Sequence, residues 1–94
     1  MRKLPARNTD PETSHEATIT EDALNLMYNR IEAMLNETPR PDFQLVPLYQ
    51  AKFGGTPSGI RSRRSELRDK GRVFFTGRYE YREGSPRRHR VWGA

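Results

Sequence analysis

The spacing of the apolar residues changes at Gly71, and this change most constrains the fold. Before Gly71, apolar side chains recur every three to four residues, which is the period of a helix that buries one face. After Gly71, β-branched and aromatic residues dominate, and polar and apolar positions alternate from Tyr79 on, which is typical of strands. Helices followed by strands in one short chain indicate the α+β class.

Two helices are expected in the first half of the chain. The first covers residues 20–36, where Thr20 can cap the helix and six apolar residues share one face: Leu24, Met27, Tyr28, Ile31, Met34 and Leu35. The second is expected over about 43–53. Asp42 can cap it, but Pro47 would be costly in a helix interior. The alternative is a cap near Val46, with Pro47 in the first helical position. Apolar contacts are expected from Phe43, Val46, Leu48, Tyr49 and Phe53.

A third helix is expected over residues 57–70. Thr56 or Ser58 caps it, Pro57 suits its first turn, and Gly71 closes it in the left-handed conformation. Two strands follow, over 72–82 and 87–92, and the turn 83–86 joins them into a hairpin. Thr76 and Gly77 indicate a bulge in the first strand. Val91 and Trp92 are expected to close the core under the hairpin.

The N-terminal part is less informative. Residues 1–9 have little to bury and are expected to form a flexible arm, and residues 11–17 to form a short helix capped by Asp10. Residues 10–94 then make one domain. No apolar run is long enough to span a membrane, and the N-terminus lacks the apolar stretch of a secretory signal. A soluble protein of the cytoplasm is expected.

The charge is divided along the chain. The net charge is +5, with 17 Lys and Arg against 12 Asp and Glu. Residues 1–50 hold 5 basic and 8 acidic side chains, which gives −3, and residues 51–94 hold 12 and 4, which gives +8. Clustered cations attract phosphates, so this division predicts a nucleic-acid partner.

The third helix is expected to carry part of this positive charge on its outer face. Ile60 and Leu67 lie seven residues apart and define the buried side. The residues expected to face solvent or DNA are Ser58, Arg61, Ser62, Ser65 and Arg68. Arg63 and Arg64 flank the apolar side, where they either reach DNA or lay their stems along the core and pair with an acidic group. Glu66 is expected to form a local ion pair.

The hairpin carries a second group of cations. They are Arg82, Arg87, Arg88 and Arg90, with His89 among them. The alternatives are a solvated charged surface and contact with phosphates or the minor groove. A base-stacking role for Trp92, Tyr79 and Tyr81 is a further alternative.

Three segments resemble small winged-helix proteins of actinobacterial phages and related mobile elements. They are Thr56–Gly71, the run Arg87-Arg88-His89-Arg90-Val91-Trp92, and the opening Thr9–Ala17. The resemblance implies a winged helix-turn-helix, with a three-helix core and a C-terminal hairpin wing, that binds DNA. It implies contact roles for Arg87, Arg88 and Arg90 of the wing and for six residues of the third helix: Ser58, Arg61, Ser62, Arg63, Arg64 and Arg68. Such proteins act as repressors, as excision or recombination factors, and in replication.

We therefore expect a phage regulator that binds double-stranded DNA, with helix 57–70 in the major groove and the 82–90 wing on the backbone or minor groove. The alternative is a protein-interaction module for an acidic host protein. A homodimer and a phage protein partner stay open. Without Cys, and without a nucleotide-binding or H-x-x-x-H motif, no enzyme, cofactor or metal site is expected.

Overall fold

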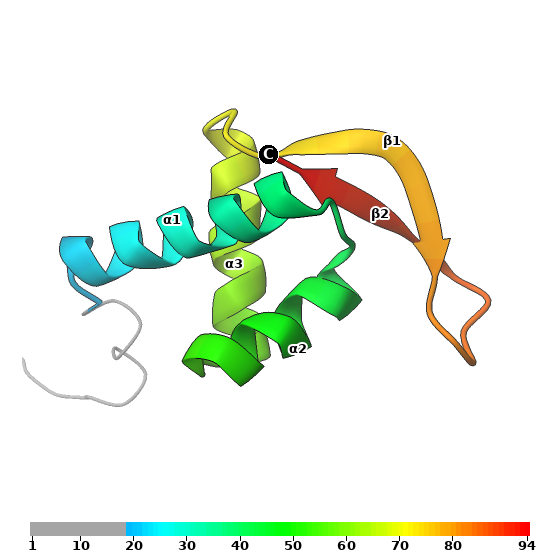
Figure 1. Cartoon of the computed structure of the whole chain (residues 1–94), viewed down its shortest axis with the longest axis horizontal. Helices are drawn as coiled ribbons and strands as arrows, with labels where there is room; N and C mark the ends of the chain where they lie inside the picture. Colours follow the sequence, from blue (N-terminus) through cyan, green and yellow to red (C-terminus); the bar gives the residue numbers. More distant parts are fainter. Residues whose placement is uncertain (1–18) are drawn as a thin grey trace, which may run out of the picture.

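The computed structural model describes residues 19–94 of the chain. The arm expected over residues 1–9 and the short helix expected over 11–17 lie outside the described residues. Three helices are followed by two strands: α1 (Glu21–Glu37), α2 (Asp42–Phe53), α3 (Pro57–Asp69), β1 (Phe74–Tyr81) and β2 (Arg88–Gly93). Figure 1 shows that the helices cross one another and that the hairpin projects from one side of them. The α+β class is confirmed.

The first helix has the predicted face and cap. The backbone N–H of Ala23 donates to the Thr20 hydroxyl oxygen over 3.1 Å. The second half of its apolar stripe is buried, namely Tyr28, Ile31, Met34 and Leu35. Within residues 19–94, no helix is both long enough and apolar enough to cross a bilayer.

The second helix has the predicted bounds to within one residue but a different cap. It begins at Asp42, and Pro41 stands in the cap position without a side-chain hydrogen bond. Asp42 is therefore the first helical residue and not the cap. Its carboxylate accepts hydrogen bonds from Arg64. Pro47 lies inside the helix, where it costs one backbone hydrogen bond that the packing of neighbouring residues offsets.

The same helix also buries a different set of side chains from the one expected. Leu45, which the predicted contacts did not include, is fully buried beside Val46 and Tyr49. Phe53 makes the expected apolar contact, with its ring centroid 5.0 Å from that of Tyr49, but it is 43% exposed and the Arg30 guanidinium lies 4.1 Å from its ring centroid.

The third helix has the predicted boundaries to within one residue. Thr56 is its cap, since its hydroxyl oxygen accepts from the N–H of Gly59 at 3.0 Å, and Pro57 follows. The helix ends at Asp69, and Gly71 then adopts a φ of +79°. This turn lets the N–H of Arg72 reach the carbonyl of Leu67 at 2.9 Å.

The hairpin is antiparallel and bulged. Tyr81 pairs with Arg88, Tyr79 with Arg90 and Phe75 with Trp92, and the register shifts between Phe75 and Tyr79. The predicted bulge is thus confirmed, and Gly77 within it has a φ of +90°. Both strands are shorter at the start than predicted.

Residues 72, 82 and 87 lie outside the strands. Arg72 is held away from β1 by Glu32 of α1, with 2.8 Å between its Nη2 and Oε1. Arg82 and Arg87 belong to the loop between the strands, where the N–H of Ser85 donates to the carbonyl of Arg82 at 3.0 Å.

The core lies where the three helices meet the base of the hairpin. Val91 and Trp92 are buried there as predicted, with Ile60 and Leu67 of α3. Arg40, between α1 and α2, forms a bridge with Trp92 through two backbone hydrogen bonds of 3.0 Å. This bridge was not predicted, and it fastens β2 to the helices.

Candidate nucleic-acid interface

A polar stripe runs along the outer side of α3. Ser58, Arg61, Ser65 and Arg68 follow the i, i+3, i+7, i+10 spacing of one helix face. Ser58 and both arginines are exposed, as predicted, whereas Ser62 and Ser65 are half-buried. In the described part of the chain, neither Arg61 nor Arg68 forms an ion pair. This stripe can therefore offer two guanidinium groups to a ligand.

Arg64 is instead a structural residue. Its Nε and Nη2 donate to the two carboxylate oxygens of Asp42 at 2.9 and 2.6 Å. Its guanidinium also lies 4.2 Å from the ring centroid of Trp92, and its side chain is only 13% exposed. Of the two alternatives for Arg64, the structure shows the pair with an acidic group, and this pair joins α3 to α2 and β2.

Arg63 belongs to a second intramolecular network. Its Nε and Nη2 each donate to the Glu66 carboxylate at 2.8 Å, so the predicted local ion pair of Glu66 is confirmed. The Tyr28 hydroxyl donates to the same carboxylate at 2.6 Å and connects α1 to α3.

Hydrogen bonds from Arg63 lower the pKa of Glu66, and the bond to Glu66 raises the pKa of Tyr28. These shifts favour the ionised carboxylate and the neutral phenol, which are the forms that the network needs.

The four arginines predicted on the hairpin are all exposed. Arg82 and Arg87 lie in the loop, and Arg88 and Arg90 lie in β2. The Arg88 guanidinium is 4.2 Å from the Tyr79 ring centroid, and that of Arg90 is 5.5 Å from the Phe75 centroid. Within residues 19–94, none of the four has a carboxylate partner. The hairpin is thus net positive, although it also contains Glu80 and Glu83.

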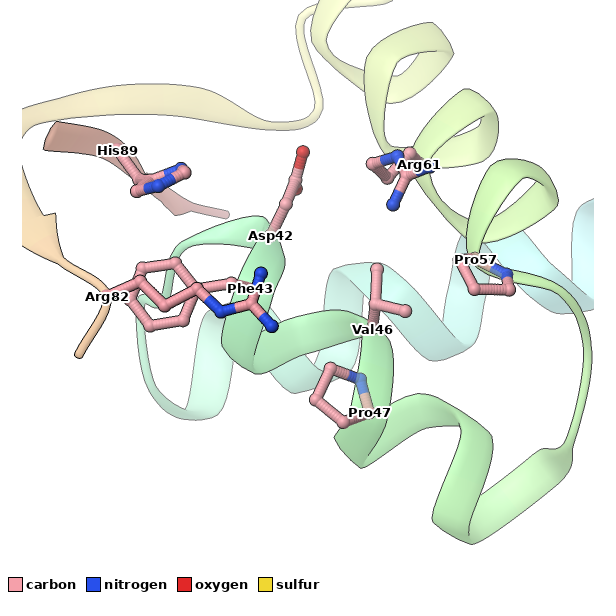
Figure 2. A pocket seen from close by; sticks show the side chains of 8 residues that line it. All are labelled: Asp42, Phe43, Val46, Pro47, Pro57, Arg61, Arg82 and His89. Carbon is pink, nitrogen blue, oxygen red and sulfur yellow. The ribbon is translucent and has the colours of Figure 1, made fainter. Parts of the chain in front are cut away.

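A groove connects the hairpin to α3. Its volume is about 450 Å³, and its walls come from α2, α3 and the hairpin. Figure 2 shows Arg61 of α3 on one side of the groove and Arg82, Phe43 and His89 on the other. The rings of Phe43 and His89 pack edge to face at 5.0 Å. The groove brings Arg61 of α3 and Arg82 of the hairpin to one surface, whereas Arg88 and Arg90 project from the other face of the hairpin.

Two features of this surface escaped prediction. Arg78 is exposed in the bulged part of β1, and its signal was a basic residue placed between Gly77 and Tyr79. Asp42 lines the groove, but Arg64 neutralises it. That pair bridges 22 positions of sequence, so no local pattern marks it.

Comparison with family models, with curated proteins and with solved structures gives no match for this chain. Among residues 19–94, no group of three His, Asp or Glu side chains is placed to hold a metal ion.

Proposed function

We propose that the chain is a winged helix-turn-helix protein that binds double-stranded DNA, with α3 in the major groove and the hairpin as the wing. The order of helix, helix, helix and hairpin supports this fold. So does the bridge between Arg40 and Trp92, because it adds a short third β segment from between α1 and α2 to the hairpin. The base of the wing is thereby fixed relative to α3.

The division of the arginines carries the proposal. Arg63, Arg64 and Arg72 are paired with carboxylates inside the molecule. The arginines predicted to face DNA and lacking a carboxylate partner among the described residues are Arg61, Arg68, Arg82, Arg87, Arg88 and Arg90. Such cations repel one another, which destabilises the folded protein, and contact with a phosphate backbone neutralises them.

The dimensions of α3 suit this role. Its 13 residues span about 20 Å at 1.5 Å per residue, and the major groove of B-DNA, about 12 Å wide, admits a helix. Ser58 and Arg61 lie in its N-terminal half, where base contacts of helix-turn-helix proteins are usually made. An arginine there can bind guanine through O6 and N7, or bind a phosphate.

The proposed biological role follows from the resemblance to phage winged-helix proteins. It is a phage regulator, acting on transcription or on excision and recombination. A transcriptional regulator binds its own promoter region, and an excision factor binds and bends attachment-site DNA. Both roles use the same surface.

Fluorescence anisotropy with labelled duplex DNA tests the proposal. We expect Arg61→Ala and Arg68→Ala each to weaken binding by about 1–3 kcal/mol for a base contact, and less for a phosphate contact. The matched control is Lys70→Ala. This substitution removes the same charge two residues beyond Arg68. The Lys70 Nζ, however, lies 5.6 Å from the ring centroid of Tyr28 on α1 and not on the polar stripe.

Equal affinities for all three variants and the unmodified protein would contradict the proposal. Absence of duplex binding at low salt, together with specific binding to an acidic protein, would favour the protein-interaction alternative.

A further inference from the structure

One face of the hairpin combines exposed aromatic rings with arginines. Opposed residues of an antiparallel pair share a face, as do alternate residues of one strand. The register therefore places Tyr81, Tyr79 and Phe75 of β1 on the same face as Arg88, Arg90 and Trp92 of β2. We call these six residues the aromatic–arginine face.

Three rings of this face are in contact, and the aromatic residues become more exposed away from α3. Trp92, beneath Arg64, is 5% exposed, whereas Tyr81 is 65% exposed. Between them, the centroids of Trp92 and Phe75 lie 6.2 Å apart and those of Phe75 and Tyr79 5.2 Å apart. In the described part of the chain, no segment covers Tyr81. The outer end of the series is therefore open to a ligand.

The charge of this face is entirely positive. Arg88 stacks on Tyr79, and Arg90 lies near Phe75. None of the six residues of this face is acidic. Glu80 belongs to the opposite face, where its Oε1 accepts from Nε2 of Gln44 at 2.9 Å. A ligand of this face must therefore tolerate apolar rings and bring negative charge.

Unpaired nucleotides meet both requirements. Bases stack on aromatic rings and on guanidinium planes, and their phosphates pair with arginine. In an intact duplex the base faces are already stacked on one another, so these rings could gain nothing by stacking. A second copy of the chain is disfavoured, because a symmetric contact would place Arg88 and Arg90 against their own equivalents with no carboxylate between them.

We propose that the aromatic–arginine face binds single-stranded DNA, with bases stacked on Tyr81 and on the Tyr79–Arg88 pair. This inference goes beyond the proposed function, since it concerns another ligand and does not depend on α3. If both hold, the protein recognises a junction at which duplex DNA on α3 continues into an unpaired strand on the hairpin.

The first test uses the unmodified protein and two labelled single strands of equal length, oligo-dT and an abasic oligonucleotide with the same phosphates. We expect oligo-dT to bind at least about fivefold more tightly, because stacking contributes about 5- to 150-fold per base. Equal affinities would overturn the inference, since phosphate attraction alone would then explain the binding. Tighter binding to anionic lipid vesicles than to oligo-dT would overturn it as well.

The second test uses Tyr81→Leu, which keeps an apolar side chain but removes the ring. We expect it to weaken oligo-dT binding by about fivefold or more and to leave duplex binding unchanged. The matched control is Phe74→Leu, because Phe74 is 54% exposed but lies on the opposite face of the hairpin. Equal effects of the two substitutions on oligo-dT binding would overturn the inference.

Arg61→Ala distinguishes this inference from the proposed function. It should weaken duplex binding and leave oligo-dT binding unchanged. If Arg61→Ala weakens duplex binding but Tyr81→Leu leaves oligo-dT binding unchanged, the inference fails and the proposed function stands. If Tyr81→Leu weakens oligo-dT binding but Arg61→Ala and Arg68→Ala leave duplex binding unchanged, the proposed function fails and the inference stands.

Discussion

At the scale of single residues, the arginines of α3 divide into two kinds by what lies opposite them. Arg63 and Arg64 are engaged by Glu66 and Asp42, while Arg61 and Arg68 face outward. Helical geometry predicts this difference in position, because Arg63 and Arg64 flank Ile60 and Leu67. It does not predict the partners, since Asp42 and Tyr28 reach α3 only through the tertiary fold.

The network around Glu66 predicts a pH dependence of stability. The folded-state pKa of Glu66 is lowered, mainly by the hydrogen bond from Arg63. The contribution of the ionised Glu66 to stability is therefore complete above the unfolded-state pKa of about 4.3, and it is lost as pH falls through the lower folded-state pKa. The raised pKa of Tyr28 acts in the opposite sense. The contribution of the neutral Tyr28 hydroxyl to stability is present below the unfolded-state pKa of about 10 and is lost as pH rises through the folded-state pKa.

Urea denaturation of Glu66→Gln checks this prediction. Near neutral pH we expect the substitution to lower the free energy of unfolding by about 1 kcal/mol, a modest value because Glu66 is partly exposed. The difference from the unmodified protein should shrink as pH falls below about 4. Glu37→Gln, at an exposed position of α1, is the control. A difference that stays constant with pH would show that ionisation of Glu66 does not stabilise the fold.

At the scale of elements, local signals predict the helices better than the strands. The ends of α1 and α3 follow from Thr20, Thr56 and Gly71, whose capping or conformational roles need only neighbouring residues. The bounds of α2 also agree with the prediction to within one residue, but its cap is Pro41, and Pro47 is accommodated inside the helix, where Leu45 and Val46 are buried. The start of β1 was misplaced because Arg72 pairs with Glu32, 40 residues earlier.

The hairpin as an element predicts a salt effect. Each phosphate contact contributes about −0.9 to the slope of log affinity for duplex DNA against log salt concentration. Replacement of Arg87, Arg88 and Arg90 together by Gln should therefore reduce the magnitude of the slope by about 2–3 if all three contact phosphates. Binding should weaken on all duplex sequences alike. Titrations at several salt concentrations measure the slope, and an unchanged slope would exclude the hairpin from the duplex interface.

At the scale of the whole molecule, packing brings one cation from each of two basic segments into a shared groove. The base of the hairpin is fixed by burial of Trp92 and by its bridge to Arg40, and Arg61 and Arg82 consequently share a groove (Figure 2). The sequence predicts both segments and most of their exposed cations. It could not predict the groove or the aromatic–arginine face, because both depend on long-range packing and on the register of the hairpin.

The central claim is that α3 and the hairpin together form the duplex-binding surface. Its most direct test is a titration of the isotope-labelled protein with a short duplex, followed by the amide chemical shifts of each residue. The largest changes should fall on residues 57–69 and 78–90, with small changes on α1, which lies across α3 from the polar stripe. Changes concentrated on α1, or no changes at low salt, would contradict the claim.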